Sequence, residues 1–331
     1  MRLSAMGDVA MTVPVLRAFV NQHPDVKITV VSRPFFKPFF DSIPNVSFFA
    51  FDEKERHKGF LGLLRLFQDL KELNVDAFAD LHNVLRSKIV RSLFALIGKK
   101  VASVDKGRVD KKALTQPENK VFKQLPTMFE RHCSVFKELG FTVDLSSPIF
   151  PDKQALDTEI IKITGEKKQK WVGIAPFAQY DSKVYPLDLM REVINQLAKN
   201  TDCKILLFGG GKKEIELLNS LCSNKENVIN MAGQFKLQQE LQLISNLDVM
   251  LSMDSGNAHI AAMLGVKVIT LWGATHPYSG FAPFNQPMEN ELVSDRNQFP
   301  KLPTSVYGNK IVEGYEDAMR TIAVEDIIRL L

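Results

Sequence analysis

The sequence predicts an α/β protein made of two domains, each with a doubly wound parallel sheet covered by helices. Its length of 331 residues exceeds the usual size of a single domain. Apolar runs of strand length alternate with amphipathic stretches of helix length, a pattern typical of parallel sheets with helical connections. A polar stretch at 151–170 interrupts the alternation once. We therefore expect two such domains facing a central cleft, with ligand sites at the strand-to-helix turns.

The first half of the chain contains four apolar runs that predict buried strands and two amphipathic stretches that predict helices. The residues from about Pro14 are also compatible with a helix. The expected strands are 27–33, 46–52, 75–81 and 99–105, and the expected helices are 60–73 and 85–98.

The second half restarts the alternation after the polar stretch, whose middle is compatible with a short helix. The segment 301–314 is loop-like, and we assign it no chemistry. The expected strands are 170–177, 204–211, 227–233, 248–254 and 267–273, and the expected helices are 187–200, 212–222, 237–247, 257–265 and 323–331.

The composition, with 45% apolar and 24% charged residues, is that of an ordinary globular protein. No apolar run reaches the roughly 18 to 20 residues of a spanning helix, so we expect neither an integral membrane protein nor a secreted one. Cys133, Cys203 and Cys222 are too few and too scattered for a disulfide framework or a zinc site. A cytoplasmic location fits these features.

The net charge of +4 conceals a difference between the two halves. Residues 1–150 carry 23 Lys and Arg against 16 Asp and Glu, whereas residues 151–331 carry 19 against 22. A basic half favours an anionic partner, which is a nucleic acid, an acidic lipid surface or a phosphorylated glycan. The alternative is a basic surface that is merely solvated.

The turn in MDSGNAHIAAMLG contains the most specific pattern. A strand ends at Asp254 and a helix starts near Asn257, which leaves the N–H groups of about 256–258 unpaired at the positive end of a helix dipole. Such a turn binds anions, and a diphosphate fits there with Ser255 and His259 adding hydrogen bonds. The alternative is that Asp254 and Ser255 cap the helix and His259 is an ordinary core histidine.

A second turn, in LLFGGGKKEIELL, places three glycines between a strand and a helix. It lacks the G-x-x-x-x-G-K-[ST] pattern of a P-loop and the G-x-G-x-x-G pattern of a dinucleotide site, so neither is predicted. Glu214 or Glu216 is placed to reach a ribose hydroxyl. The alternative is a solvated carboxylate in the first turn of the helix.

Two further turns carry single candidates. Lys183 follows the first strand of the second half, where its ammonium group is placed to neutralise phosphate charge. The alternative is an ordinary surface lysine, because surface lysines are common. Asp8 follows Gly7 near the start of the chain, where a carboxylate facing a cleft accepts a proton from an attacking hydroxyl. The alternative for Asp8 is a helix cap.

Together these turns resemble those of glycosyltransferase family 9, whose best known members are the heptosyltransferases of the lipopolysaccharide inner core. The last of its motifs, D-[ST]-G-x-x-H-[IL]-A-A followed by a strand and G-x-T-x-P, is the most specific. The resemblance rests on RLSAMGDVAMTVPVLRA (2–18), DLHNVLRS (80–87), FGGGKKEIE (208–216) and MDSGNAHIAAMLGVKVITLWGATHP (253–277).

The resemblance implies the GT-B fold, with two Rossmann-like domains and inverting catalysis that needs no metal cofactor. The implied domains are 1–155 for the acceptor, a linker at 156–168, 169–322 for the nucleotide-sugar donor, and a helix at 323–331 that packs back at the interdomain junction. Family members usually carry an apolar strand before the R-L-S-x-x-G-D motif. Here Met1 directly precedes Arg2, so the first strand is expected to be missing, or Asp8 to be held differently.

The resemblance also assigns roles to individual residues. Asp8 matches the general base, and Lys183 matches a lysine that contacts donor phosphate and stabilises the leaving group. The residues assigned to the donor are Lys183, Gly209, Gly210, Glu214, Met231, Gly233, Asp254, Ser255, Gly256 and His259, of which Met231 and Gly233 frame the adenine and the last four form the diphosphate turn.

An acceptor of the lipid A and Kdo type is anionic, which gives the basic half a partner. The segment 54–67 is either an interfacial helix or a core-packed helix with a solvated basic start. A nucleic-acid partner is not expected, because no basic stripe rich in aromatic residues is present. The residues expected to meet the acceptor anions are Arg86, Lys88, Lys106, Arg108 and Arg131.

The resemblance thus predicts transfer of heptose from ADP-heptose to a lipopolysaccharide core acceptor by a cytoplasmic enzyme, in peripheral contact with the inner membrane. One alternative is a transferase of the same family with a different nucleotide sugar or acceptor. The other is a nucleotide-sugar binding protein without turnover.

Overall fold

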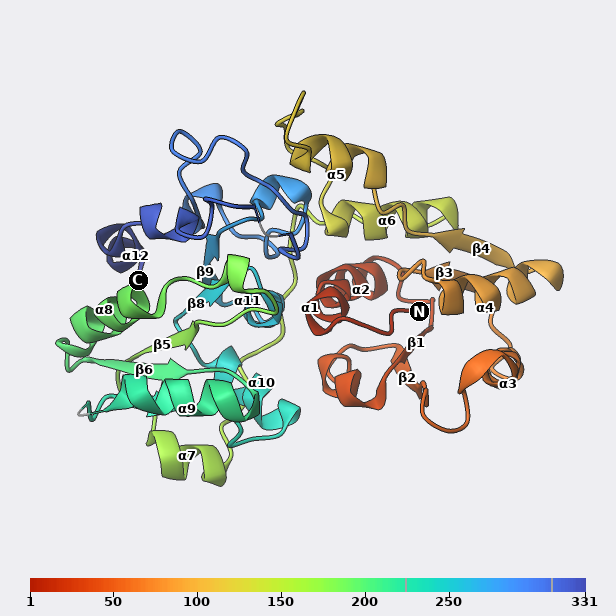
Figure 1. Cartoon of the computed structure of the whole chain (residues 1–331). Helices are drawn as coiled ribbons and strands as arrows, with labels where there is room; N and C mark the ends of the chain where they lie inside the picture. Colours follow the sequence, from red (N-terminus) through yellow and green to blue (C-terminus); the bar gives the residue numbers. More distant parts are fainter. Residues whose placement is uncertain (224, 311) are drawn as a thin grey trace. The chain divides into compact units, whose positions relative to one another are not determined.

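The computed structural model describes residues 1–223, 225–310 and 312–331, which form two compact units (Figure 1). The first unit comprises residues 1–107 and 126–150, and the second comprises 108–125 and 151–331. Both contain parallel strands connected by helices, so the predicted α/β class is confirmed.

The first unit contains two pairs of parallel strands. Strand β1 (Ile28–Ser32) pairs with β2 (Val46–Ala50), and β3 (Ala77–Asp80) pairs with β4 (Lys100–Ser103). The extended residues 1–3 lie between the pairs, because Arg2 N donates to Val31 O at 3.1 Å and the Met1 ammonium donates to Ala79 O at 2.7 Å. These residues therefore occupy the place of a central strand, although they form no regular strand within the described chain.

Helices follow each of these extended segments. The residues from Pro14 are helical, as expected, but helical structure begins earlier, with α1 at Met6 and α2 at Thr12. The apolar faces of α3 and α4 join Val31, Phe51 and Phe78 in the core of this unit. The helices are α1 (Met6–Ala10), α2 (Thr12–Gln22), η1 (Pro34–Phe39), α3 (Gly59–Lys71), α4 (Leu85–Leu96) and α6 (Met128–Glu138).

The second unit is built on one parallel sheet of six strands in the order β10-β9-β8-β5-β6-β7. Its core strands consist almost wholly of buried residues, as expected when helices cover both faces. The strands are β5 (Lys170–Ala175), β6 (Cys203–Leu207), β7 (Val228–Asn230), β8 (Val249–Met253), β9 (Lys267–Trp272) and β10 (Glu291–Val293). The short strand β10 was not predicted.

Helices α7 to α12 of this unit lie where the periodicity predicts them, whereas α5 and the short 3-10 helices were not predicted, and α12 packs against α8 (Figure 1). The segment 301–314 forms neither helix nor strand over the residues that the structure describes. The helices are α5 (Arg108–Thr115), α7 (Thr158–Thr164), η2 (Asp181–Lys183), α8 (Leu187–Ala198), α9 (Gly211–Cys222), α10 (Leu237–Ser245), α11 (Gly256–Met263), η3 (Pro277–Ser279), η4 (Met288–Asn290), η5 (Ala318–Thr321) and α12 (Val324–Leu330).

Residues 108–125, which we call the strap, belong to the second unit although the expected range of the first domain includes them. Leu125 N donates to Tyr278 O at 2.9 Å, and Lys120 Nζ donates to Pro303 O at 2.8 Å. The Arg296 guanidinium lies 3.5 Å from the centre of the Phe122 ring. These contacts hold the strap on the second unit, a long-range association that sequence periodicity does not reveal.

The strand order of the second unit places a topological switch point between β5 and β8. From β5 the chain proceeds to β6 and β7 on one side, and then to β8, β9 and β10 on the other. The connections diverge at this point, and ligands of open α/β sheets bind beyond the carboxyl ends of the strands at such a point.

Candidate active site

Lys183 and Asp254 meet at the switch point of the second unit. Lys183 lies in η2 beyond β5, and Asp254 directly follows β8. Lys183 Nζ donates to Asp254 Oδ2 at 2.9 Å, and the two side chains are only 11% and 9% exposed. Thr275 Oγ1, in the loop after β9, donates to the same carboxylate oxygen at 2.9 Å. The carboxylate therefore holds the lysine in place at the end of the sheet.

Helix α11 begins at Gly256, immediately after this pair. Its N-cap residue is Ser255, whose side chain makes no capping hydrogen bond and lies 3.1 Å from Ser252 Oγ. His259, one turn into the helix, is buried. The first-turn N–H groups and the positive end of the dipole thus lie beside Lys183, which is the arrangement that the sequence predicts for an anion site.

The glycine turn after β6 is closed by a contact of its own. Gly210 N donates to Glu214 Oε2 at 2.7 Å, so the carboxylate caps the start of α9. A Cβ atom on Gly209 would lie 3.0 Å from the same oxygen, which leaves little room for a side chain. This contact agrees with the alternative of a first-turn carboxylate, and a ribose contact by Glu214 stays a prediction.

Met231 and Gly233 follow β7 and continue the same edge of the sheet. Met231 is buried, and Gly233 adopts a positive φ of 73° that favours glycine. Along the edge, Asp254 after β8 and Lys183 after β5 come first, and the β6 and β7 turns follow. The groups predicted for the diphosphate therefore follow the adjacent strands β5 and β8. Those predicted for the nucleoside follow β6 and β7, farther along the same edge of the sheet.

Sequence reasoning missed how the loops around Lys183 support it. A Cβ atom on Gly308 would collide with the side-chain carbons of Lys183, and Ser182 Oγ donates to Gly308 O at 2.6 Å. Ala274 N also donates to Ser182 O at 3.0 Å. The segment 301–314 thus gains a role, because its Tyr-Gly-Asn turn packs on the lysine. The glycine in that turn was the available signal.

Asp8 lies in the first unit, within the short helix α1. Its Oδ2 atom is 2.5 Å from Arg2 NH2 and accepts from Ala5 N at 3.2 Å. Arg2 NH1 donates to Leu81 O at 2.8 Å, so the guanidinium bridges the carboxylate to the turn after β3. The Asp8 side chain is 28% exposed. It caps its helix, and it also remains accessible to a ligand.

The turn after β3, residues 80–83, is fixed by buried polar contacts. Asp80 Oδ1 accepts from His82 N at 3.0 Å and from Asn83 N at 2.7 Å. Leu3 N donates to His82 Nδ1 at 3.4 Å. Burial, reinforced by the positive charge of Arg2, lowers the pKa of His82 to about 4, so its ring is neutral near pH 7.

The five predicted acceptor residues differ in their surroundings. Arg86 pairs with Glu53 at 2.8 Å, Lys88 is exposed, and Lys106 contributes to the lowered pKa of His82. Arg108 is exposed on the strap, in the second unit. Arg131 is buried and donates to Asp105 O and Pro126 O, both at 3.2 Å. Their contacts with an acceptor stay a prediction.

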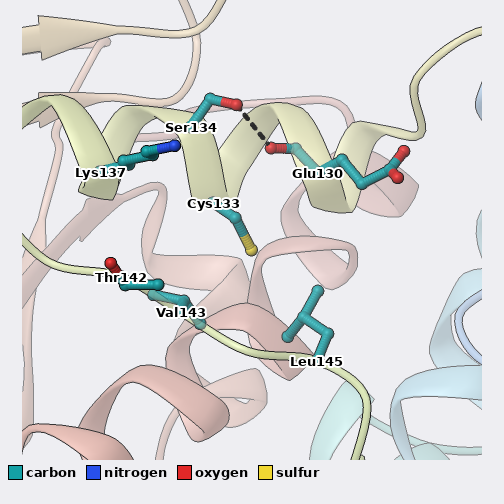
Figure 2. A pocket seen from close by; sticks show the side chains of 7 residues that line it. All are labelled: Glu130, Cys133, Ser134, Lys137, Thr142, Val143 and Leu145. Atoms are coloured by element: carbon teal, nitrogen blue, oxygen red, sulfur yellow. Dashed lines mark hydrogen bonds between the residues drawn. The ribbon is translucent and has the colours of Figure 1, made fainter.

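A hollow on the first unit lies along α6 and the chain that follows it (Figure 2). None of the predicted site residues lines it. Ser134 Oγ donates to Glu130 O at 3.0 Å, and burial raises the pKa of the Cys133 thiol to about 11, which disfavours its reactive thiolate form. The lining residues are Glu130, Cys133, Ser134, Lys137, Thr142, Val143 and Leu145.

Two absences among the described residues concern the membrane and metal predictions. They contain no helix both long and apolar enough to cross a membrane. Nor do they contain a group of three or more His, Cys, Asp or Glu side chains arranged to hold a metal ion. The metal independence of the reaction stays a prediction.

Comparison with known proteins decides the family. The sequence model of glycosyltransferase family 9 (heptosyltransferase) matches residues 63–311, which are most of the chain. The chain belongs to glycosyltransferase family 9. The predicted resemblance is therefore confirmed, and with it the class of enzyme.

Individual members of family 9 match this chain over nearly its whole length. The lipopolysaccharide core heptosyltransferase OpsX of Haemophilus influenzae is 26% identical, with 99% of this chain and 94% of OpsX covered. A family 9 crystal structure from Veillonella parvula is similar with a TM-score of 0.74 at 18% identity, covering 99% and 93% of the two chains. The Escherichia coli heptosyltransferase WaaC with ADP gives a TM-score of 0.68 at 18% identity, covering 99% and 97%. These structures share the predicted GT-B fold.

Proposed function

We propose that this protein is an inverting glycosyltransferase that transfers heptose from ADP-heptose to a lipopolysaccharide core acceptor. Membership of family 9 and the name of the relative OpsX support the reaction, and the ADP in the WaaC structure supports the donor. The observation that carries the proposal is the Lys183–Asp254 pair beside the N-terminus of α11, at the switch point of a Rossmann-like sheet.

The second unit binds the donor in this proposal. Lys183 and the first-turn N–H groups of α11 contact the diphosphate, and the turns after β6 and β7 contact the nucleoside. As the glycosidic bond to the diphosphate breaks, negative charge grows on the departing oxygen. The ammonium and the helix dipole stabilise that charge because both are already oriented toward it.

The first unit supplies the base. Asp8 accepts the proton of the acceptor hydroxyl while the hydroxyl oxygen attacks the anomeric carbon. The attack comes from the face opposite the diphosphate, so the configuration at that carbon inverts. Arg2 holds the carboxylate from one side through its 2.5 Å contact, and the exposed part of the side chain faces the acceptor.

The acceptor in this proposal is an anionic glycolipid of the lipid A and Kdo type, reached at the cytoplasmic face of the inner membrane. Arg86, Lys88 and Lys106 supply positive charge on the first unit. At the start of α3, Phe60 and Leu61 are 63% and 68% exposed, and the exposed Lys58 immediately precedes the helix. Exposed apolar side chains next to basic ones support peripheral contact with an anionic bilayer.

The decisive experiment compares transfer and ADP binding in the wild type and in Asp8→Asn. The amide keeps the size of the side chain and removes the base, so we expect kcat to fall by about a thousandfold or more. Calorimetry in the presence of a chelator should give the same Kd for ADP in both proteins. Asp41→Asn, which alters only an exposed carboxylate paired with Lys37, is the matched control. Undiminished transfer by Asp8→Asn would overturn the role of Asp8.

Donor competition tests the sugar nucleotide separately. We expect ADP-heptose to compete with a labelled donor at lower concentration than UDP- or GDP-sugars. A preference for another nucleotide would keep the family and the mechanism but change the substrate. ADP binding with no transfer to any lipid A and Kdo acceptor would instead favour a nucleotide-sugar binding protein.

A further inference from the structure

The first unit has a switch point of its own. Residues 1–3 lie between β1 and β3, so the chain diverges there as it does between β5 and β8 in the second unit. Asp8 follows the segment 1–3, and His82 follows β3. The two side chains therefore occupy positions equivalent to those beyond β5 and β8, where Lys183 and Asp254 lie.

Arg2 ties these two turns together. One nitrogen of its guanidinium contacts Asp8 Oδ2 at 2.5 Å, and the other donates to the carbonyl of Leu81, the residue before His82. The backbone of the next residue, Leu3, donates to the His82 ring. The segment 1–3 thus contacts both side chains, the Asp8 carboxylate through Arg2 and the His82 ring through Leu3.

The contact with Leu3 fixes the form of the ring. His82 Nδ1 accepts a hydrogen bond, so in the neutral ring the proton is on Nε2. Burial and the nearby charges of Arg2 and Lys106 lower the pKa of His82 to about 4 and outweigh the opposite effect of Asp8 and Asp80. At neutral pH this side chain is therefore a hydrogen-bond donor rather than a base.

The donor atom is not fully enclosed by the protein. Within the described chain no group forms a hydrogen bond with Nε2, and the atom does not belong to the enclosed polar atoms that lack a partner. Water therefore reaches it although the residue is 9% exposed. The Nε2–H group is a fixed, accessible hydrogen-bond donor at a switch point, near the Asp8 carboxylate. Such a group is placed to contact a ligand.

We propose that His82 is an acceptor-binding residue, which donates a hydrogen bond from Nε2 to a sugar oxygen of the acceptor and so positions the attacking hydroxyl at Asp8. This inference rests on the proposed function and adds a residue to its acceptor site. No proton is transferred to His82, because the neutral ring already carries the hydrogen that it donates.

Two substitutions separate this role from a structural one. In His82→Asn the amide oxygen takes the place of Nδ1 and still accepts from Leu3 N, but no donor reaches the position of Nε2. In His82→Gln the longer side chain places its amide nitrogen near the Nε2 position. Folding is checked by thermal unfolding, and His23→Asn, a substitution of the half-buried histidine after α2, is the matched control.

Steady-state transfer is measured with ADP-heptose and Kdo-containing lipid A. We expect His82→Asn to raise the KM for the acceptor at least tenfold. The KM for the donor and the Kd for ADP should stay within about twofold of the wild-type values, and Tm within about 2 °C. His82→Gln should restore the acceptor KM to within about threefold. An unchanged acceptor KM in His82→Asn, or a loss that His82→Gln does not restore, would overturn the assignment. Absence of transfer by the wild type would instead overturn the proposed function on which it rests.

Discussion

The ammonium group of Lys183 and the carboxylate of Asp254 form an ion pair across the switch point of the six-stranded sheet, with Nζ 2.9 Å from Oδ2. The two residues are 71 positions apart in the chain, and the pair joins the loops after β5 and β8. Both side chains are mostly buried, and Thr275 bonds to the same oxygen. Removing either partner alone therefore leaves a charge with little access to water.

Lys183→Met should accordingly lower the free energy of unfolding by about 3 kcal/mol, because Asp254 keeps a buried charge without its partner. The double variant with Asp254→Asn removes both charges and should be more stable than the single variant. Urea unfolding measures both changes. ADP binding should be lost in both proteins, since neither contains the ammonium. A double variant less stable than the single one would show that the pair is not the reason for the loss.

The attachment of the strap to the second unit should depend on the contact between Phe122 and Arg296. The guanidinium lies 3.5 Å from the ring centre, and the ring also contacts His276 and Tyr278. We expect a double-mutant cycle of Phe122→Leu and Arg296→Met to give a coupling free energy of about 1 kcal/mol. Both single variants should also increase proteolysis within 108–125. Additive effects of the two substitutions would contradict a direct contact.

The elements that position the site were predictable because each has a local signal. The strands and helices of the second unit follow from apolar runs and helical periodicity, and their alternation indicates the parallel sheet. The turn after Asp254 was predicted from a strand, a Ser-Gly turn and a helix start. Asp8 was one candidate from its turn alone, but only the family motif selected it as the base, since one carboxylate near a glycine has many roles.

Other features depend on distant parts of the chain and left no local signal. The contact of Lys183 with Asp254 and Thr275 requires the strand order, which periodicity does not give. The strap interrupts the first unit without a change in composition at its ends. Strand β10 has only three residues, and no longer apolar run marks it in the sequence. The packing of Gly308 on Lys183 likewise follows from the tertiary structure.

Three buried histidines should destabilise the protein in acid. Burial lowers the pKa of His132 to about 3 and that of His82 and His276 to about 4, from the ordinary value of 6.5. Below pH 6.5 the unfolded chain binds protons that the folded chain does not, so the free energy of unfolding falls as the pH decreases. His276→Asn keeps an acceptor for Tyr278 N and removes one titrating ring. Its stability should therefore fall less steeply between pH 6.5 and 4, by up to about 1.4 kcal/mol per pH unit.

Glu291 should make the free energy of unfolding fall as the pH rises, which is the opposite of the effect of the histidines. Its Oε2 atom accepts from Trp272 Nε1 at 2.5 Å, and burial raises the pKa of the carboxyl from 4.5 to about 8, with a smaller contribution from the charge of Asp254. The unfolded chain releases this proton above pH 4.5, whereas the folded chain keeps it until about pH 8. The free energy of unfolding therefore falls between these values by up to about 1.4 kcal/mol per pH unit and is level above them.

Glu291→Gln isolates this effect, because the amide stays neutral at every pH. We expect the difference in unfolding free energy between the variant and the wild type to shift in favour of the variant as the pH rises from 5 to 8, and then to stay constant. Urea unfolding at four or five pH values measures it, with Glu289→Gln, an exposed carboxylate near the same strand, as the control that should give a level difference. A level difference for Glu291→Gln as well would mean that Glu291 is ionised in the folded protein. Trp272 would then donate to a buried charge next to the Lys183–Asp254 pair, and the electrostatic balance of the donor site would include a second carboxylate.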